Sequence, residues 1–378
     1  MNIVRTVKLL SLIKALVKSE FRSASDLMGE MHGLPQKLGQ HFTLYRAPGF
    51  EGCFETLCTE SPAEDICIDE ILKELNLAAR AVQLHARASI GQVYRVETAE
   101  GILAVKARYP GVEKRIKSDF RLLRRLLWPT RFMPLRNSAL MPLLDYLAAL
   151  LICECDYIRE AGMQETFRRV FREEHDITVP EVVAFSPRAI ASPWVAGPTL
   201  AGRLDSVDRR FVETYLKFIL KSLKEAGMVH ADPHPGNFII TGGHLTVLDF
   251  GSAACFAPRE TTAVLRLLAG DYETAAQLAE DLELLGVSGE TLEVYRPILG
   301  DLVSIMLEPL YYPGEYDFSG WRMQYKLNTL LASRSWERPL AIPPGLLLLL
   351  RTLHGLYFYA RRNYIFLNWH DIIRKYLG

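Results

Sequence analysis

The chain has 378 residues, of which 49% are hydrophobic, so it is long enough to bury a large core. Lysine plus arginine and aspartate plus glutamate both number 44, and this balance argues against the basic surface of a nucleic-acid-binding protein. The six cysteines include no C-x-x-C pair and the nine histidines show no zinc spacing, which favours free thiols in a reducing compartment over a zinc site.

The N-terminal 80 residues predict a helical extension. The first 22 combine apolar periodicity with basic residues, lack the cleavage site of a signal peptide, and are too interrupted for a membrane span. Such a helix either lies on an anionic membrane surface or packs on the body with its basic face in water. We detect no transmembrane span elsewhere, so we expect a protein of the cytoplasm or an organelle matrix, peripheral to a membrane at most.

Residues 81–196 predict a mixed segment, the N lobe of a larger domain. Residues 92–97 and 101–108 alternate in the manner of β-strands and are joined by a turn-like Thr-Ala-Glu-Gly, which predicts a hairpin. The preceding residues 86–92 predict a loop. Helices are expected at about 112–128 and 138–172, followed by strands at 179–184 and 189–195.

Residues 197–378 predict a mostly helical C lobe. A helix is expected over 208–227, then two short strands at 238–240 and 245–248 joined by Thr-Gly-Gly-His, then a helix from 259. The sequence therefore predicts an α+β protein of two lobes, with boundaries at 1–80, 81–196 and 197–378.

Two motifs in the C lobe carry the chemistry. His230-Ala-Asp-Pro-His-Pro-Gly-Asn237 is followed twelve residues later by Asp249-Phe-Gly, and the two motifs flank the predicted strand pair. Kinase-like folds use this layout to hold nucleotide and metal. Asp232 would position the acceptor, whereas Asn237 and Asp249 would supply hard oxygen ligands to Mg²⁺. Either motif alone arises by chance often, but both at this spacing are much harder to attribute to chance.

Such a site needs a strand lysine and a phosphate-covering loop. Lys106, at the end of the predicted hairpin, is suited to contact the phosphates of ATP. A Gly-x-Gly-x-x-Gly loop would be expected before it, but the chain reads Ala86-Arg-Ala-Ser89-Ile-Gly. Side chains restrict φ there, so this loop would close on phosphate less freely than glycines allow.

These motifs together resemble the UbiB family of atypical kinases. The resemblance rests on the Ala/Ser loop, Val-Lys-x-x-Tyr-Pro-Gly-Val at 105–112, Glu154-Cys-Asp-Tyr-Ile-Arg-Glu160, the two motifs above, and Lys37-Leu-Gly-Gln40 in the extension. It implies a kinase-like fold that binds Mg²⁺ and ATP and acts near lipid or isoprenoid-quinone intermediates.

The resemblance also implies roles for further residues. Ala86, Ala88 and Ser89 would cover the nucleotide, and Lys37 and Gln40 would gate the site from the extension. One of Glu154 and Glu160 would pair with Lys106 and the other with Lys37. We expect Glu154, Asp156 and Glu160 to lie on one helix. We favour the pairs Glu160–Lys106 and Glu154–Lys37, and the reverse assignment remains open.

Four departures from protein kinases or from the family pattern bear on activity. His234 stands where protein kinases carry a lysine that neutralises the moving phosphoryl group. A predicted helix follows Asp-Phe-Gly so soon that no activation loop is left to receive a peptide. Arg87 adds a cation to the Ala/Ser loop, and Pro193 removes a backbone donor from the expected hinge.

The sequence favours an ATP-dependent atypical kinase or ATPase of lipid or quinone metabolism, with little protein phosphorylation. A phosphotransferase for a soluble small molecule and a nucleotide-gated scaffold with little turnover remain alternatives. The expected partners are nucleotide and a membrane surface or lipid intermediate, and not nucleic acid.

Overall fold

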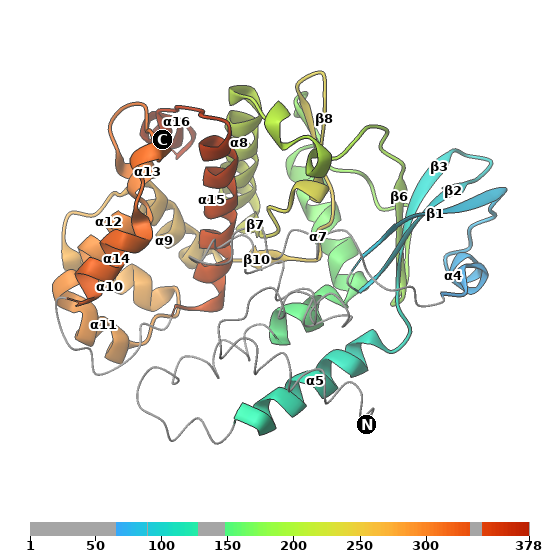
Figure 1. Cartoon of the computed structure of the whole chain (residues 1–378), viewed down its shortest axis with the longest axis horizontal. Helices are drawn as coiled ribbons and strands as arrows, with labels where there is room; N and C mark the ends of the chain where they lie inside the picture. Colours follow the sequence, from blue (N-terminus) through green and yellow to red (C-terminus); the bar gives the residue numbers. More distant parts are fainter. Residues whose placement is uncertain (1–65, 89, 128–147, 333–341, 378) are drawn as a thin grey trace. The chain divides into compact units, whose positions relative to one another are not determined.

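The computed structural model describes residues 66–88, 90–127, 148–332 and 342–377 (Figure 1). The described chain divides into two compact units. The first contains residues 66–127, 148–165 and 180–196, and the second contains residues 166–179 and 197–377. Lys37 and Gln40 lie outside the described residues.

The first unit is built on an antiparallel sheet of five strands in the order β1-β2-β3-β6-β5. The strands are β1 (Ala81–Arg87), β2 (Gly91–Glu97), β3 (Ile102–Arg108), β5 (Ala184–Phe185) and β6 (Ala189–Pro193). Gly91 is required where β2 meets β3, because a Cβ at this position would lie 2.2 Å from the carbonyl oxygen of Ala107. The predicted hairpin at 92–108 is confirmed.

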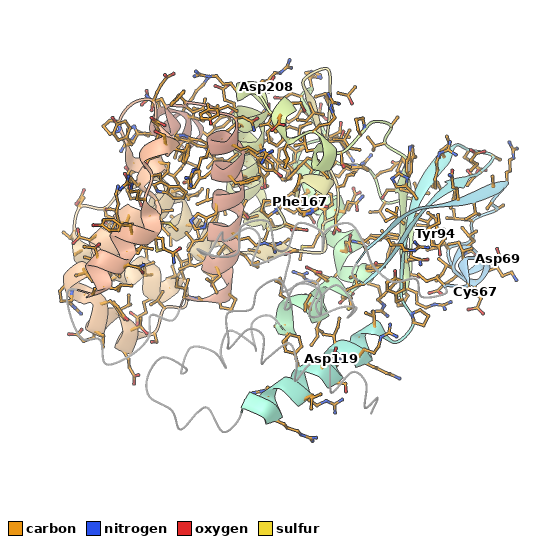
Figure 2. The ribbon with its side chains drawn as sticks, viewed as in Figure 1. Cys67, Asp69, Tyr94, Asp119, Phe167 and Asp208 are labelled. Carbon is orange, nitrogen blue, oxygen red and sulfur yellow. The ribbon has the colours of Figure 1, made fainter. Side chains whose placement is uncertain are left out.

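Helices pack against this sheet or continue from it. They are α4 (Ile68–Glu74), α5 (Val112–Leu127), a helical run over 148–154, and the first part of α7 (Tyr157–Val170). Alternate residues of β2 and β3 form the core with Ile71 and Leu72 of α4, and Tyr94 is buried among them (Figure 2). This alternation is the half-buried strand pattern that the sequence displays.

The second unit is organised around α8 (Arg209–Ala226), whose apolar face is deeply buried. Asp208 caps its start by accepting a hydrogen bond from the Phe211 amide at 2.8 Å, and Gly227 ends it in a left-handed conformation (Figure 2). Two small sheets adjoin this helix. One pairs β7 (Met228–His230) with β10 (Ala253–Cys255), and the other has the order β4-β9-β8, with β4 (Ile177–Thr178), β8 (Phe238–Thr241) and β9 (His244–Val247).

The remainder of the second unit is helical (Figure 1). Its α-helices are α9 (Pro258–Ala269), α10 (Ala275–Leu284), α11 (Gly289–Tyr295), α12 (Leu299–Met306), α13 (Glu308–Tyr311), α14 (Met323–Ala332), α15 (Pro344–Arg362) and α16 (Trp369–Leu377). The long helix α15 packs against α8 and against β7 and β10. None of the described helices has the length and apolar character needed to cross a membrane.

Three expectations for single elements are wrong. Residues 86–87 belong to strand β1 rather than to a loop. Residues 179–184 form a strand only at Ala184, in β5. In the described part of 138–172, the helix is interrupted between residues 154 and 157, because Asp156 accepts a hydrogen bond from the Arg159 amide and caps a new helix.

Candidate functional site

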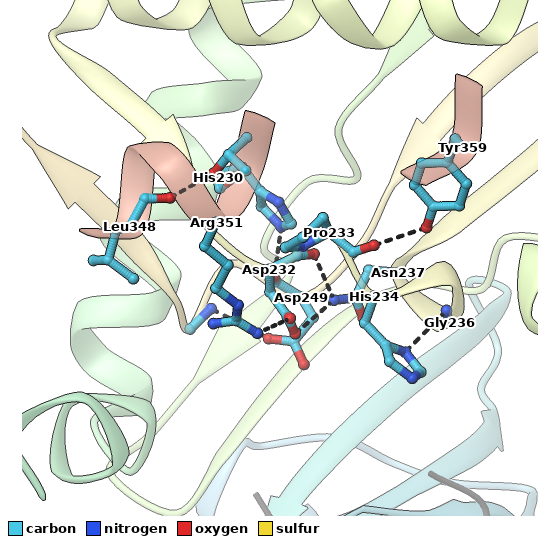
Figure 3. A network of polar contacts seen from close by, with 12 residues as sticks. His230, Asp232, Pro233, His234, Gly236, Asn237, Asp249, Leu348, Arg351 and Tyr359 are labelled. Atoms are coloured by element: carbon cyan, nitrogen blue, oxygen red, sulfur yellow. Dashed lines mark hydrogen bonds and ion pairs between the residues drawn. The ribbon is translucent and has the colours of Figure 1, made fainter. Parts of the chain in front are cut away.

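The loop after β7 brings Asp232 and Asn237 together. A short 3-10 helix, Pro235–Asn237, turns the chain back, so that the Asn237 amide donates to Asp232 Oδ2 at 2.9 Å and to the Asp232 carbonyl at 3.2 Å (Figure 3). Both side chains are buried, with exposures of 8% and 9%. Because the Asn237 nitrogen is used by Asp232, its Oδ1 oxygen is left as the acceptor.

Asp249 is held in a strained conformation beside this loop. Its φ of 57° is in the left-handed region, which a non-glycine residue adopts at a cost. Its Oδ1 accepts from the Gly251 amide at 3.2 Å, and its carbonyl accepts from His230 Nε2 at 2.7 Å (Figure 3). Burial lowers the pKa of His230, so the imidazole is neutral and carries its proton on the nitrogen that bonds Asp249.

The β8–β9 hairpin sets the two motifs side by side. Its strands pair in register from Phe238–Val247 to Thr241–His244, and Gly242 and Gly243 both have positive φ, as a tight hairpin turn requires. The Leu248 amide donates to the Asn237 carbonyl at 2.8 Å, just beyond the last strand pair. The open end of the hairpin therefore positions Asn237 next to the segment that carries Asp249.

An aromatic cluster supports this end of the second unit. Phe250 lies 5.1 Å from Phe167 and 5.3 Å from His230, measured between ring centroids. Phe167 stacks in turn on Phe218 of α8 at 5.5 Å (Figure 2). These rings are almost fully buried and fix the backbone on both sides of Asp249.

The oxygens at this site suit a divalent cation shared with a ligand. Asn237 and Asp249 offer an amide and a carboxylate oxygen, which are the ligand types that Mg²⁺ prefers, and Mg²⁺ completes its shell with waters and phosphate oxygens. Within the part of the chain that the structure describes, no group of three or more His, Cys, Asp or Glu side chains could hold a metal by itself. The donor set fits a phosphate-bound Mg²⁺ better than a dedicated protein cage.

Helix α15 closes over the loop, which sequence reasoning missed. Arg351 Nη2 lies 2.5 Å from Asp232 Oδ1, Thr352 Oγ1 donates to the His230 carbonyl at 3.1 Å, and Tyr359 donates to the Pro233 carbonyl at 2.7 Å (Figure 3). These three side chains share one face of α15. In the sequence, the only sign of this contact is that Arg351 directly follows five leucines, which predicts a charged side chain in an apolar setting.

The first unit contains Lys106, which forms an ion pair with Glu160. Lys106 Nζ lies 2.8 and 3.1 Å from the two carboxylate oxygens of Glu160 and 5.3 Å from the centroid of the Tyr157 ring. The Glu160 side chain is 2% exposed, so this ion pair is shielded from water. This is the pairing that the sequence favoured for Lys106.

Glu154 is buried, but it is not on the same helix as Glu160. The sequence placed Glu154, Asp156 and Glu160 on one helix, and this is wrong because Asp156 caps the helix that begins at Tyr157. Since Lys37 lies outside the described residues, the structure gives no contact for the expected Glu154–Lys37 pair.

The Ala/Ser loop is shorter than the sequence suggested. Ala86 and Arg87 are exposed residues of strand β1, where Arg87 pairs with Gln92 across the sheet. The Ala88 amide donates to the Gly91 carbonyl at 2.8 Å. Ser89 lies outside the described residues.

His234 has a structural contact within the loop after β7. Its Nδ1 accepts a hydrogen bond from the Gly236 amide at 3.1 Å and caps the 3-10 helix that leads to Asn237. This nitrogen must be unprotonated to accept that bond. His234 therefore does not supply the cation that protein kinases have at this position.

Comparison with known proteins identifies the family. An ABC1 atypical kinase-like domain matches residues 77–279, which is more than half of the chain. The chain belongs to the UbiB family of atypical kinases. The matched segment includes Lys106, Glu160 and the loop that carries Asp232 and Asn237, whereas α15 lies beyond residue 279. The α+β, kinase-like fold predicted from the sequence is thereby confirmed.

This UbiB-family chain is similar in sequence to proteins from plants and animals. It is 29% identical over 300 residues to Protein ACTIVITY OF BC1 COMPLEX KINASE 3, chloroplastic, of Arabidopsis thaliana, covering 74% of this chain and 40% of that protein. It is 27% identical over 308 residues to Atypical kinase COQ8B, mitochondrial, of Rattus norvegicus, covering 76% of this chain and 56% of that protein. The chain thus spans about half the length of these relatives or less.

A solved structure shares the fold. Rv3197 from Mycobacterium tuberculosis, determined in complex with erythromycin, matches with a TM-score of 0.60 at 20% sequence identity. The match covers 95% of this UbiB-family chain and 96% of that one.

Proposed function

We propose that this UbiB-family chain is an atypical kinase or ATPase that binds Mg²⁺–ATP and acts on, or in response to, isoprenoid-quinone or related lipid intermediates. The observation that carries the proposal is the grouping of Asp232, Asn237 and Asp249 at one end of a hairpin, with backbone strain at Asp249. The preformed pair of Lys106 and Glu160 supports it, because the carboxylate fixes the direction of the ammonium group that phosphate binding needs.

Each residue has a distinct role in this proposal. Mg²⁺, when bound, neutralises charge on the phosphates. Asn237 and Asp249 would hold it through their oxygens, and Lys106 would contact the phosphates while Glu160 orients its ammonium group. Asp232 would position the attacking water or hydroxyl group, because hydrogen bonds from Asn237 and Arg351 hold its carboxylate in one orientation.

The remaining assignments rest on the family. Ala86, Ala88 and Ser89 are proposed to lie over the nucleotide, Glu154 to pair with Lys37, and Lys37 and Gln40 to gate the site. Two of the relatives are named as a chloroplastic and a mitochondrial protein. We propose that this chain works in the cytoplasm or an organelle matrix close to a membrane surface, without nucleic acid.

The first experiment measures Mg²⁺-dependent ATP hydrolysis by the purified chain. Lys106→Met and Asp249→Asn should each lower kcat about a hundredfold or more, because each removes a charge that acts on the phosphates. Lys117→Met and Asp271→Asn are matched controls, since both side chains form exposed ion pairs, and they should hydrolyse ATP as the wild type does. Equal hydrolysis by all five proteins would contradict the proposal.

The second experiment identifies the class of acceptor. Hydrolysis is measured with anionic liposomes, with quinone-precursor analogues, and with water-soluble alcohols. Stimulation by the liposomes or the analogues supports action on lipids. Phosphorylation of a soluble alcohol, with no response to lipid, would favour the alternative of a small-molecule phosphotransferase.

A further inference from the structure

Arg351 is buried beside Asp232 with part of its hydrogen-bonding capacity unused. The residue is 5% exposed, and its Nη2 is engaged by the Asp232 carboxylate at 2.5 Å. Its Nε and Nη1 are buried but have no hydrogen-bond partner among the residues that the structure describes. Buried donors without acceptors are costly, so a fold that retains them has a reason to do so.

The guanidinium is suited to an oxyanion. Arginine presents its N–H groups as a planar fork that matches the oxygens of a phosphate, and its charge is permanent. Asp232 engages Nη2, which belongs to both edges of the fork, and the neighbouring Nη1 has no hydrogen-bond partner among the described residues. Figure 3 shows the guanidinium turned toward Asp232, on the side of the loop where Asp249 also lies.

The loop that carries Asp232 lacks the cation that protein kinases use to neutralise the transferred phosphoryl group. Protein kinases neutralise the moving phosphoryl group with a lysine two residues after the catalytic aspartate, where this chain has His234. The His234 Nδ1 accepts from the Gly236 amide, so His234 caps the backbone rather than offering a charge. Arg351 reaches the same aspartate from a helix 119 residues away in the sequence.

We propose that Arg351 is a catalytic residue that binds the transferred phosphoryl group through Nη1, while Nη2 holds Asp232 in place. This inference rests on the proposed function. In the reaction, the bond between the γ-phosphorus and the bridging oxygen of ATP breaks and a bond from the acceptor oxygen to the γ-phosphorus forms. The acceptor proton leaves through Asp232 to solvent, and Arg351 stays protonated throughout.

A structural role alone would give a different outcome. A buried arginine that only holds α15 against the loop would affect ADP and transition-state binding equally, or would affect folding alone. A residue that contacts the transferred group affects only the states in which that group is present and charged. The difference between ADP and ADP with aluminium fluoride, a mimic of the transferred phosphoryl group, therefore separates the two roles.

The test uses the full chain and three variants. Arg351→Met should lower kcat for ATP hydrolysis about a hundredfold and weaken binding of Mg²⁺–ADP–aluminium fluoride to a similar extent, with affinity for Mg²⁺–ADP changed less than about threefold. Arg351→Lys keeps the charge and should recover about tenfold of both losses. Arg362→Met removes an exposed ion pair between α15 and Asp205, with no contact to the loop, and should keep kcat within about threefold of the wild type.

The possible results distinguish failure of this inference from failure of the proposed function. If Arg351→Met hydrolyses ATP at the wild-type rate, or loses ADP and ADP–aluminium fluoride binding equally, the inference is wrong while the proposed function stands. If Arg351→Met does not fold, Arg351→Lys decides, and wild-type kcat and aluminium fluoride affinity in that variant would overturn the inference. If the wild type neither binds Mg²⁺–ADP nor hydrolyses ATP, the proposed function fails, and this inference fails with it.

Discussion

The close approach of α15 to the catalytic loop predicts that Gly355 cannot be replaced by alanine without cost. A Cβ at position 355 would lie 2.2 Å from Cβ and 2.4 Å from Cγ of Pro233, far inside normal contact. Alanine in place of a helical glycine stabilises a helix by about 1 kcal/mol, whereas overpacking a tight contact costs about 1–3 kcal/mol. Tyr359 and Thr352 tie the same loop to α15, so the proline ring cannot simply move away.

We therefore expect Gly355→Ala to lower the free energy of unfolding by up to about 2 kcal/mol and the thermal midpoint by up to about 8 °C. The shift of α15 should also lower kcat for ATP about tenfold, because it displaces groups that hold the catalytic loop. Thermal unfolding followed by circular dichroism, together with ATP hydrolysis, measures both effects.

Gly300 provides the control for this substitution. It is an exposed glycine within α12, and a Cβ there would have no described atom of another element within 4 Å. Gly300→Ala should therefore keep the favourable term alone and raise stability by about 0.5–1 kcal/mol. If Gly355→Ala raised the thermal midpoint as Gly300→Ala does, the reasoning about α15 and the loop would be refuted.

Three further predictions follow from charged groups. Glu160→Gln removes the charge that orients the strand lysine, so kcat for ATP should fall about tenfold with an unchanged circular dichroism spectrum, and wild-type kcat would contradict this. Lys217→Met breaks a partly buried pair of ion pairs to Glu174 and Asp176, and denaturant unfolding should show a loss of about 1 kcal/mol, whereas no change would mean that the pairs are fully screened. Burial lowers the pKa of His354 from 6.5 to about 4, so the unfolded chain takes up its proton first and stability falls as the pH drops from 6.5 toward 4. Replacing His354 by glutamine should remove up to about 3 kcal/mol of this fall, and an identical pH dependence would count against it.

The parts of the fold that sequence could predict are those with local signals. The β8–β9 hairpin is predictable from its local sequence, because alternating apolar residues flank Gly242 and Gly243. Likewise, Asp208 and Gly227 mark the ends of α8 by capping chemistry that is local to each end. The motif residues Asp232, Asn237 and Asp249 follow from these elements, since the hairpin fixes where they emerge.

The parts that sequence missed depend on contacts between distant residues or on competing local signals. Arg351 meets Asp232 across 119 residues, and no periodicity in either segment encodes that meeting. The break before α7 had a local cause, since Asp156 can cap a helix, but the apolar periodicity on both sides favoured a continuous one. Residues 86–87 form an edge strand with all side chains exposed, so β1 lacks the burial pattern by which strands are detected.

Binding of a nonhydrolysable ATP analogue, measured by calorimetry with and without Mg²⁺, tests the central claim most directly. If Asn237 and Asp249 hold a cation on the phosphates, Mg²⁺ should tighten binding to the wild type about tenfold or more and should have little effect on Asp249→Asn. Equal affinity of both proteins with Mg²⁺ and with EDTA would contradict the account.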